Sequence, residues 1–338
     1  MRAIVIREAG GLDKLELTDV EPAVPGAGQV LLKVAACGVC YRDIVDRQGG
    51  YPFMRRPVIT GHEVSGTIEA LGPGVTGFAV GDRVVVTHQH ACGECATCKA
   101  GDEKRCQTQK VYGLTIDGGY AERCVAYAGS LVHVPAQVPL EEASFLHCTA
   151  AVALRALRRF GRVAAGQTVL VTGATGGVGV HAVQVARLLG ARVIAVTGSP
   201  QKRDALAALG VDEVIVAADR SWVHAVQKAG GVDVALELVG EPTFAASLRA
   251  LKPGGQMVIV GNVTQSRVEV NPGYLIFNEV GVHGSAGATR SELRDVLAWA
   301  AEGKLRPIVA DRLPLEKARD AQAKLVDRGV FGRQILVP

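Results

Sequence analysis

The stretch VLVTGATGGVGVHAVQVA, residues 169–186, decides the fold of the second part of this chain. A short apolar run leads into a glycine-rich segment, which is followed by apolar residues at helical spacing. Glycine lets a backbone turn tightly and approach a pyrophosphate, and the first turn of the next helix offers free N–H groups. The stretch therefore predicts a strand, a phosphate-binding turn and a helix, with Gly173, Gly176, Gly177, Val178 and Gly179 at a dinucleotide. A tight turn without any ligand is the alternative.

Strands and helices alternate after this stretch. Apolar runs at residues 191–198, 212–217, 232–240, 254–261 and 279–286 read as strands, and residues 200–210 read as a helix. This alternation favours a parallel, doubly wound sheet. We expect residues 151–286 to form this dinucleotide-binding domain.

The first part of the chain has a different pattern. Short β-type runs at residues 29–39, 63–72, 81–89 and 119–135 are separated by turn signals such as PGAG and GPGV. The pattern predicts an antiparallel, barrel-like β domain over residues 1–150. Residues 287–338 read as a helix, a loop, a second helix and a last strand, and are assigned to the same domain, so the fold class is α/β.

Composition restricts the class of protein further. The net charge of +4 is small and its positive charges are scattered, which argues against a nucleic-acid partner. No apolar run approaches the ~18 residues of a membrane span, and the N-terminus does not resemble a signal peptide. We expect a cytoplasmic protein, whose eight cysteines favour metal binding or catalysis over disulfides.

Four of these cysteines, Cys92, Cys95, Cys98 and Cys106, lie close together with the spacing C-x2-C-x2-C-x7-C. Four thiolates in one short segment can enclose a tetrahedral zinc ion. An iron–sulfur cluster and disulfides are the alternatives. A closed four-cysteine shell has no open coordination position, so this pattern predicts a structural zinc in a lobe over residues 91–107.

A second set of metal-ligating residues is scattered along the sequence: Cys40, His62, Glu63 and Cys148. Two thiolates, one imidazole and an open position make a catalytic zinc arrangement. Sequence alone does not show that these side chains meet, and buried core cysteines with a core histidine are the alternative.

The chain resembles the zinc-containing medium-chain dehydrogenase/reductase superfamily, the alcohol dehydrogenase-like proteins. The resemblance covers essentially the whole length, through CGVCYRD, GHEVSGTIEALGPGV, GDRVV, CGECATCKAGDEKRC and GATGGVGVHAVQVA in this order. It implies a GroES-like β domain, an inserted Rossmann domain and a C-terminal return to the first domain. Within the superfamily, CYRDIVDRQGGYPFMRRPVITGHE and IVGNVT resemble a branch that includes acryloyl-CoA reductases.

The resemblance also implies roles for individual residues. Cys40, His62 and Cys148 would ligate a catalytic zinc, with Glu63 behind it or as a further ligand, which makes two zinc ions per chain. Asp43 would accept the second ring N–H of His62. Arg333 would lie near the cofactor pyrophosphate, and Gly261, Asn262 and Val263 near the nicotinamide. The family also suggests a homodimer or homotetramer.

The end of the second predicted strand bears on the cofactor. NAD-binding sites usually carry a carboxylate there, which binds the ribose 2′-hydroxyl. Here Thr197 and Ser199 occupy the strand end, followed by Lys202 and Arg203. Without a carboxylate to repel a 2′-phosphate, we expect NADP(H) rather than NAD(H); cations that merely solvate a helix start are the alternative.

One position departs from the alcohol dehydrogenase pattern. Those enzymes usually carry Ser or Thr two residues after the first zinc cysteine, where the hydroxyl relays a proton, and this chain has Arg42. Because arginine stays protonated, it is a poor general base. We therefore expect hydride transfer to a short α,β-unsaturated substrate such as an enoyl-CoA. The alternatives are an alcohol dehydrogenase or aldehyde-ketone reductase, and a non-catalytic nucleotide-binding protein with structural zinc only.

Overall fold

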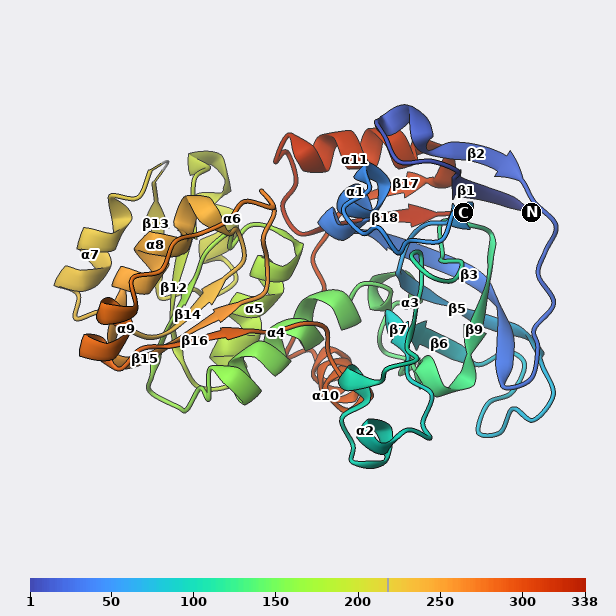
Figure 1. Ribbon diagram of the computed structural model, residues 1–338, viewed down its shortest axis with the longest axis horizontal. Coiled ribbons are helices and arrows are strands. Elements are labelled where there is room, and N and C mark those ends of the chain that lie inside the picture. The colour runs from blue at the N-terminus through green and yellow to red at the C-terminus, as the bar shows by residue number, and fades with distance from the viewer. Residues whose placement is uncertain (218) are drawn as a thin grey trace. The chain divides into compact units, whose positions relative to one another are not determined.

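The computed structural model describes residues 1–217 and 219–338, which form two compact units (Figure 1). The first unit contains residues 1–148, 287–303 and 307–338, and the second contains residues 149–286 and 304–306. Residues 304–306 join the second unit, where the side-chain amide of Gln184 exchanges two hydrogen bonds with the backbone of Arg306. The expected domain boundaries differ from this division at residues 149–150 and 304–306.

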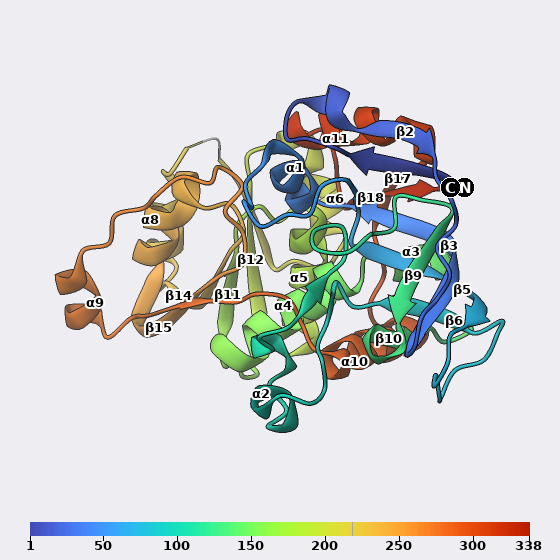
Figure 2. The ribbon, with the colours of Figure 1, turned by 45° about the vertical axis from the view of Figure 1, so that its right-hand side comes forward.

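The first unit is built on a sheet in the order β10-β6-β5-β3-β18-β17, with β9 also paired to β3. A smaller sheet has the order β2-β1-β4, and β7 pairs with β8. The strands are β1 (Arg2–Ile6), β2 (Glu16–Asp19), β3 (Gln29–Val39), β4 (Val58–Ile59), β5 (Glu63–Leu71), β6 (Arg83–Val86), β7 (Gln89–His90), β8 (Lys110–Val111), β9 (Arg123–Tyr127), β10 (Leu131–His133), β17 (Val309–Pro314) and β18 (Arg333–Val337). Their pairs are antiparallel except β17 with β18, which run parallel and can be followed in Figure 2. The sequence did not predict β17.

Strand β3 forms the centre of this unit. Every second side chain of its first part is buried, at Val30, Leu32, Val34 and Ala36, which is the period of a strand with one face in a core. Because β3 pairs with β5, β9 and β18, it brings distant parts of the chain together. The residue that follows its last position is Cys40, so the strand carries this thiol to the edge of the core.

Short helices complete the first unit. They are α1 (Tyr41–Gln48), α2 (Ala96–Lys99), α3 (Leu140–Ala143), α10 (Arg290–Ala301) and α11 (Ala318–Val326). Helix α1 follows β3 directly and packs against α11. Helix α10 begins with a capping box in which Thr289 and Glu292 satisfy each other's backbone N–H groups.

The second unit contains a six-stranded sheet in the order β13-β12-β11-β14-β15-β16, and all neighbouring strands are parallel. The strands are β11 (Thr168–Val171), β12 (Arg192–Thr197), β13 (Glu213–Val216), β14 (Val232–Glu237), β15 (Leu251–Ile259) and β16 (Gly281–Gly284). The helices are α4 (Val152–Arg155), α5 (Gly177–Leu188), α6 (Arg203–Ala207), α7 (Trp222–Lys228), α8 (Glu241–Arg249) and α9 (Pro272–Asn278).

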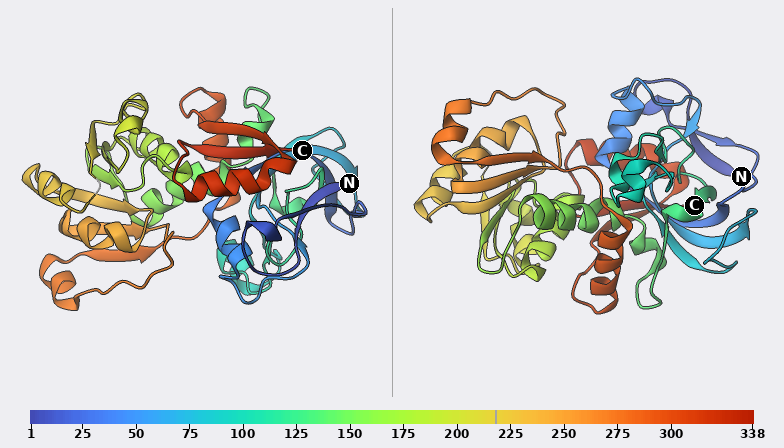
Figure 3. Two further views of the ribbon diagram at one scale, coloured as in Figure 1. Left: turned by 90° about the horizontal axis from the view of Figure 1, so that it is seen from above. Right: turned by 60° about the horizontal axis from the view of Figure 1, so that its bottom comes forward.

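Strand order in this sheet runs outward in both directions from β11. Right-handed crossovers therefore place the helices of the two halves on opposite faces of the sheet, as Figure 3 shows. The α/β fold class expected from the sequence, an antiparallel β domain with a doubly wound parallel-sheet domain, is confirmed. No helix in the part of the chain that the structure describes is long and apolar enough to cross a bilayer.

The helical segment over residues 140–160 is irregular. After α3, residues His147–Ala151 form a π-helical turn, and a second one follows α4 at Ala156–Phe160. π-Helical turns often occur at functional sites. The first of these turns carries Cys148.

Candidate metal centre and cofactor-binding turn

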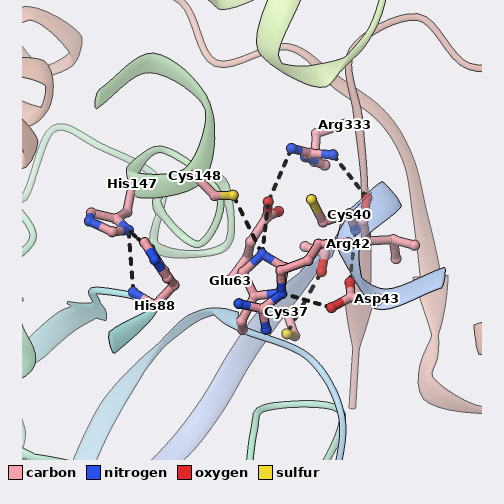
Figure 4. Close-up of polar contacts among 12 residues, drawn as sticks. Cys37, Cys40, Arg42, Asp43, Glu63, His88, His147, Cys148 and Arg333 are labelled. Atoms are coloured by element: carbon pink, nitrogen blue, oxygen red, sulfur yellow. Dashed lines mark hydrogen bonds and ion pairs between the residues drawn. The ribbon is translucent and has the colours of Figure 1, made fainter. Parts of the chain in front are cut away.

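Four metal-ligating side chains that are far apart in sequence meet in the first unit (Figure 4). Cys40 follows β3, His62 directly precedes β5, Glu63 begins β5, and Cys148 lies in the π-helical turn. Their ligand atoms all lie within 4.8 Å of one another, and Nε2 of His62 is 3.4 Å from Sγ of Cys148. The core-residue alternative considered from sequence does not explain this convergence.

Glycines beside the site make room for it. A Cβ atom at Gly38 of β3 would lie 1.9 Å from Oε2 of Glu63, so only glycine leaves space for that carboxylate. Gly61 has a φ of +90°, which favours glycine, and a Cβ there would lie 2.2 Å from the ring of Tyr120. These two positions allow His62 and Glu63 to enter the core.

Asp43 orients the imidazole of His62. Its Oδ1 accepts a hydrogen bond from Nδ1 of His62 at 2.8 Å, and its Oδ2 accepts from the backbone N–H of Cys40 and from the hydroxyl of Tyr120. The carboxylate is therefore fully used, and the proton of His62 is held on Nδ1, which leaves the lone pair of Nε2 towards the two thiols. Burial lowers the pKa of His62, but the charge and hydrogen bond of Asp43 raise it overall to about 10 in the metal-free site, so a metal that binds Nε2 must displace its proton.

Glu63 is fully buried, and neither oxygen of its carboxylate receives a hydrogen bond. Burial raises its pKa to about 7, although the charge of Arg333 opposes this shift. Nη2 of Arg333 is 3.0 Å from Oε1 of Glu63, but its N–H groups do not point at the oxygen, and Nη1 donates to the carbonyl of Val39. A buried carboxylate without donors is suited to a cation. The expected contact of Arg333 with a cofactor pyrophosphate stays a prediction.

The donor set fits zinc. Two thiols, one imidazole nitrogen with a free lone pair and one carboxylate converge, and zinc prefers sulfur and nitrogen ligands. A hydrogen bond from the thiol of Cys148 lowers the pKa of Cys40 well below its usual value, so one thiolate forms readily. With three ligands from Cys40, His62 and Cys148, a tetrahedral zinc ion would keep a fourth position, which suits a site that also admits a substrate.

Arg42 lies beside this set on α1. Its Nε is 3.1 Å from Oδ2 of Asp46, one turn further along the helix, and its Nη2 donates to the carbonyl of Tyr112 at 2.9 Å. Asp46 is fully buried, and burial raises its pKa to about 6 against the charge of Arg42. The residue that replaces the usual hydroxyl is thus held rigidly next to the ligands.

Sequence reasoning missed some side chains around the site. His88 lies edge-on to His62, with ring centroids 6.3 Å apart, and shares a hydrogen bond of 3.2 Å with His147, whose Nε2 is 3.1 Å from the carbonyl of Ala288. Tyr120 binds Asp43, as described above. Neither His88 nor Tyr120 belongs to a local motif, so no pattern in the sequence points to them.

The other cysteine cluster forms a separate site. The sulfur atoms of Cys92, Cys95, Cys98 and Cys106 also lie within 4.8 Å of one another. The backbone N–H of Cys95 donates to Sγ of Cys92, and that of Cys92 donates to Sγ of Cys106. All eight cysteines are free thiols, and four sulfur ligands fill the coordination shell of a tetrahedral ion, which leaves no position for a substrate. The arrangement fits a structural zinc.

In the second unit, the predicted phosphate-binding turn joins β11 to α5. Gly173 has a φ of +56°, and a Cβ atom at Gly179 would lie 2.3 Å from the carbonyl oxygen of Gly173. Gly176 is the N-cap of α5, and Gly177 and Val178 begin the helix. β11 and β14 lie side by side where the strand order reverses, and such a crevice at the carboxyl ends of strands binds nucleotides. The cradle fits a nicotinamide dinucleotide.

The remaining predicted cofactor residues also lie at carboxyl ends of strands in this sheet. Thr197 ends β12, and its hydroxyl accepts a hydrogen bond from the backbone N–H of Ser199. Lys202 and Arg203 follow at the start of α6, and burial lowers the pKa of Lys202. Gly261, Asn262 and Val263 follow β15, and the N–H of Val263 bonds to the carbonyl of Val239 after β14. The sheet brings these segments to one edge.

Comparisons with known proteins agree with this geometry. Residues 26–136 match the family described as alcohol dehydrogenase GroES-like domain, and residues 177–302 match the family described as zinc-binding dehydrogenase. The acryloyl-coenzyme A reductases of Sulfurisphaera tokodaii and Metallosphaera sedula are 38% and 39% identical to this chain, over 100% and 99% of both partners.

A solved structure titled "crystal structure of AibC" is 43% identical, with a TM-score of 0.94 over 100% of this chain and 96% of that one. Relatives named as reductases or dehydrogenases argue against a non-catalytic nucleotide-binding protein. The chain belongs to the zinc-containing medium-chain dehydrogenase/reductase superfamily, where it resembles the acryloyl-CoA reductase-like branch, and is an NAD(P)-dependent zinc oxidoreductase.

Proposed function

We propose that this oxidoreductase uses NADPH to reduce a short α,β-unsaturated thioester of the acryloyl-CoA type. The observation that carries the proposal is Arg42, a fixed guanidinium where an alcohol dehydrogenase has a proton-relaying hydroxyl. The likeness to two proteins named acryloyl-coenzyme A reductase supports the same substrate class.

The residues of the site have separable roles. Cys40, His62 and Cys148 would hold the catalytic zinc, with Glu63 as a reserve ligand behind it, and bound zinc supplies a Lewis acid that stabilises negative charge on a substrate oxygen. Asp43 keeps His62 in the tautomer that a ligand needs. Arg333 partly compensates the charge of Glu63. The glycine turn of the second unit would bind the cofactor that supplies hydride.

The two candidate reactions differ in the atom that must lose or gain a proton. Alcohol oxidation must remove a proton from the substrate oxygen, which needs a base or a relay near it. Reduction of a conjugated double bond delivers its proton to carbon, so the oxygen needs only stabilisation. A permanently protonated guanidinium suits the second requirement and not the first.

An alcohol dehydrogenase or aldehyde-ketone reductase is the second candidate, which the match to an alcohol dehydrogenase domain favours. Purified enzyme should be assayed with NADPH and NADH against acryloyl-CoA and crotonyl-CoA, and against simple aldehydes and ketones. We expect turnover of the enoyl thioesters. Turnover of carbonyl compounds alone would contradict the proposal.

The two cysteine-containing sites and the end of β12 suggest which metal ions and which nicotinamide cofactor the chain binds. We propose two zinc ions per chain, one catalytic and one held by Cys92, Cys95, Cys98 and Cys106. We propose NADP(H) rather than NAD(H), because Thr197, Ser199 and Lys202 surround the strand end that usually carries a carboxylate in NAD-binding sites.

We also propose a homodimer or homotetramer. Ile276 and Phe277 of α9 are 74% and 91% exposed, and β16, next along the chain, is an edge strand whose outer backbone groups have no partner strand among the described residues. An apolar patch beside an open strand edge favours self-association.

A further inference from the structure

We propose that Arg42 is a catalytic residue whose free amino group, Nη1, donates a hydrogen bond to the substrate oxygen that becomes an enolate. The inference rests on the proposed enoyl reduction and adds a second stabilising group to the metal. The guanidinium would thus have a function of its own, apart from the loss of the hydroxyl that it replaces.

The guanidinium is fixed on two sides. Nε contacts Oδ2 of Asp46 and Nη2 donates to the backbone carbonyl of Tyr112, while the side chain is only 20% exposed. A group held by two contacts has lost most of its rotational freedom, so it pays little entropy when it binds a substrate.

The third nitrogen is left over. Within residues 1–217 and 219–338, Nη1 has no hydrogen-bond partner, and it is not among the buried atoms that lack one. It therefore keeps some exposed surface, and five N–H donors in a fixed fork make arginine a strong donor to an anionic oxygen.

The contact with Asp46 is not an optimal ion pair. A bidentate pair would satisfy both carboxylate oxygens, but Nη2 binds Tyr112 instead, and Oδ1 of Asp46 remains buried without a donor. A purely structural arginine at this position would gain by closing the second contact. The observed orientation gives up that contact and keeps the guanidinium turned towards other acceptors.

The charge of Arg42 reaches the metal-ligand set. Arg42 lies two residues after Cys40, in the same close-up (Figure 4), and its charge lowers the pKa of His62. Burial lowers the pKa of Arg42, but the charges of Asp46 and Asp43, with smaller effects of Cys148 and Cys40, raise it above its usual value. A substrate oxygen that reaches these ligands therefore enters the field of the guanidinium.

The charge of Arg42 would act on one step of the reaction, the formation of the enolate. The β-carbon accepts a hydride from the reduced nicotinamide, the π electrons of the Cα–Cβ bond form a Cα–carbonyl double bond, and the carbonyl π pair becomes the negative charge of the enolate oxygen. Water then gives a proton to Cα, the carbonyl reforms, and hydroxide and the oxidised nicotinamide remain. Arg42 keeps its protons throughout. Because the charge exists only after hydride attack begins, its stabilisation raises kcat more than it lowers KM.

Acetoacetyl-CoA provides a test without turnover, because it forms a stable enolate with its own ultraviolet band. It should be titrated into zinc-loaded enzyme without nicotinamide, for wild type, Arg42→Gln and Arg42→Lys. Arg47→Gln is the matched control, since Arg47 is a buried arginine on the same helix that binds Gln322 and the carbonyl of Gly10. Zinc content and thermal unfolding are measured for each variant.

We expect the wild type and Arg47→Gln to show the enolate band at neutral pH, and Arg42→Gln to lose it. With crotonyl-CoA, Arg42→Gln should lose about 10²–10³-fold in kcat, the cost of removing one oxyanion donor, with a smaller change in KM. Arg42→Lys should recover part of both signals, because it keeps a charge but not the fork.

An unchanged band and unchanged kcat in Arg42→Gln would overturn the inference. If that variant does not fold, Arg42→Lys decides, and wild-type values for both signals in it would overturn the inference. A wild-type enzyme that turns over only carbonyl compounds would instead overturn the proposed function, which is a separate outcome of the same preparations.

Discussion

Oδ1 of Asp43 lies 2.8 Å from Nδ1 of His62, and both side chains are buried. The aspartate comes from the first turn of α1 and the histidine from the start of β5, so the contact joins two elements through one imidazole. It determines which nitrogen of His62 faces the thiols of Cys40 and Cys148.

Asp43→Asn should therefore weaken zinc binding at the proposed catalytic site. Loss of such an outer partner typically costs about 10–100-fold in metal affinity, because the imidazole becomes less basic and less well oriented. Competition with a chromophoric chelator measures the affinity. Asp46→Asn, on the same helix but without contact to a ligand, is the control and should keep both metals. Equal affinities in wild type and Asp43→Asn would contradict the role given to Asp43.

Substitutions should distinguish the roles of the two cysteine-containing sites. Native mass spectrometry should find two zinc ions in wild type and roughly one in Cys148→Ala and in Cys98→Ser. Cys148→Ala should abolish activity with little change in unfolding temperature, because its metal serves the reaction. Cys98→Ser should lower the unfolding temperature first, because a closed site contributes its binding energy to folding. Retained activity in Cys148→Ala would refute the catalytic assignment.

Cofactor choice should respond to Ser199→Asp. A carboxylate near the end of β12 would repel a 2′-phosphate and accept a hydrogen bond from a 2′-hydroxyl. Hydrogen bonds to charged groups contribute about 1.5–3 kcal/mol, so we expect kcat/KM for NADPH to fall by ~10–100-fold relative to NADH. Steady-state kinetics with both cofactors checks this. A ratio that stays constant would show that Ser199 does not face the ribose.

The pH dependence of stability should involve His90. Burial, and then the charges of Lys110 and Arg290, lower its pKa to about 4, while its ring stacks on Tyr127 at 4.0 Å. The unfolded chain, with a histidine pKa of about 6.5, binds more protons than the folded protein between these two values. Stability is therefore fully present above about pH 6.5 and is lost as pH falls towards 4.

His90→Phe keeps an aromatic ring but cannot bind a proton. The drop in urea midpoint between about pH 7.5 and about pH 5 should be smaller in this variant than in wild type. His224→Gln, at an exposed histidine of α7, should show the wild-type drop. A wild-type drop in His90→Phe would mean that other groups cause the acid sensitivity.

Self-association should depend on α9. Phe277→Asp places a charge in the apolar patch beside β16, and loss of one buried phenylalanine costs about 1.5–3 kcal/mol, or ~10–100-fold in the dissociation constant. Sedimentation velocity across a dilution series measures this. Val80→Asp, at an exposed apolar residue of the first unit, should associate like wild type. If both variants behave alike, the interface lies elsewhere.

Local patterns determined much of this protein. The sequence alone predicts strand β3, in whose first part every second side chain is buried, and the glycine turn before α5. Both depend on residues that are close together in the sequence. The four-cysteine lobe is similarly local, because all its ligands lie within one short segment. The irregular helix around Cys148 is a different case, since side-chain periodicity does not distinguish a π-helical turn from an α-helical one.

Only the tertiary structure decided the chemistry. Cys40, His62 and Cys148 meet because β3 pairs with β5 and because the chain returns to them at the π-helical turn that carries Cys148, and neither fact follows from a local pattern. The same holds for Tyr120 on Asp43 and for the two contacts that fix Arg42. The sequence identifies side chains that could react, but the distances between them depend on long-range strand pairing. Those distances turn separate residues into a candidate metal site.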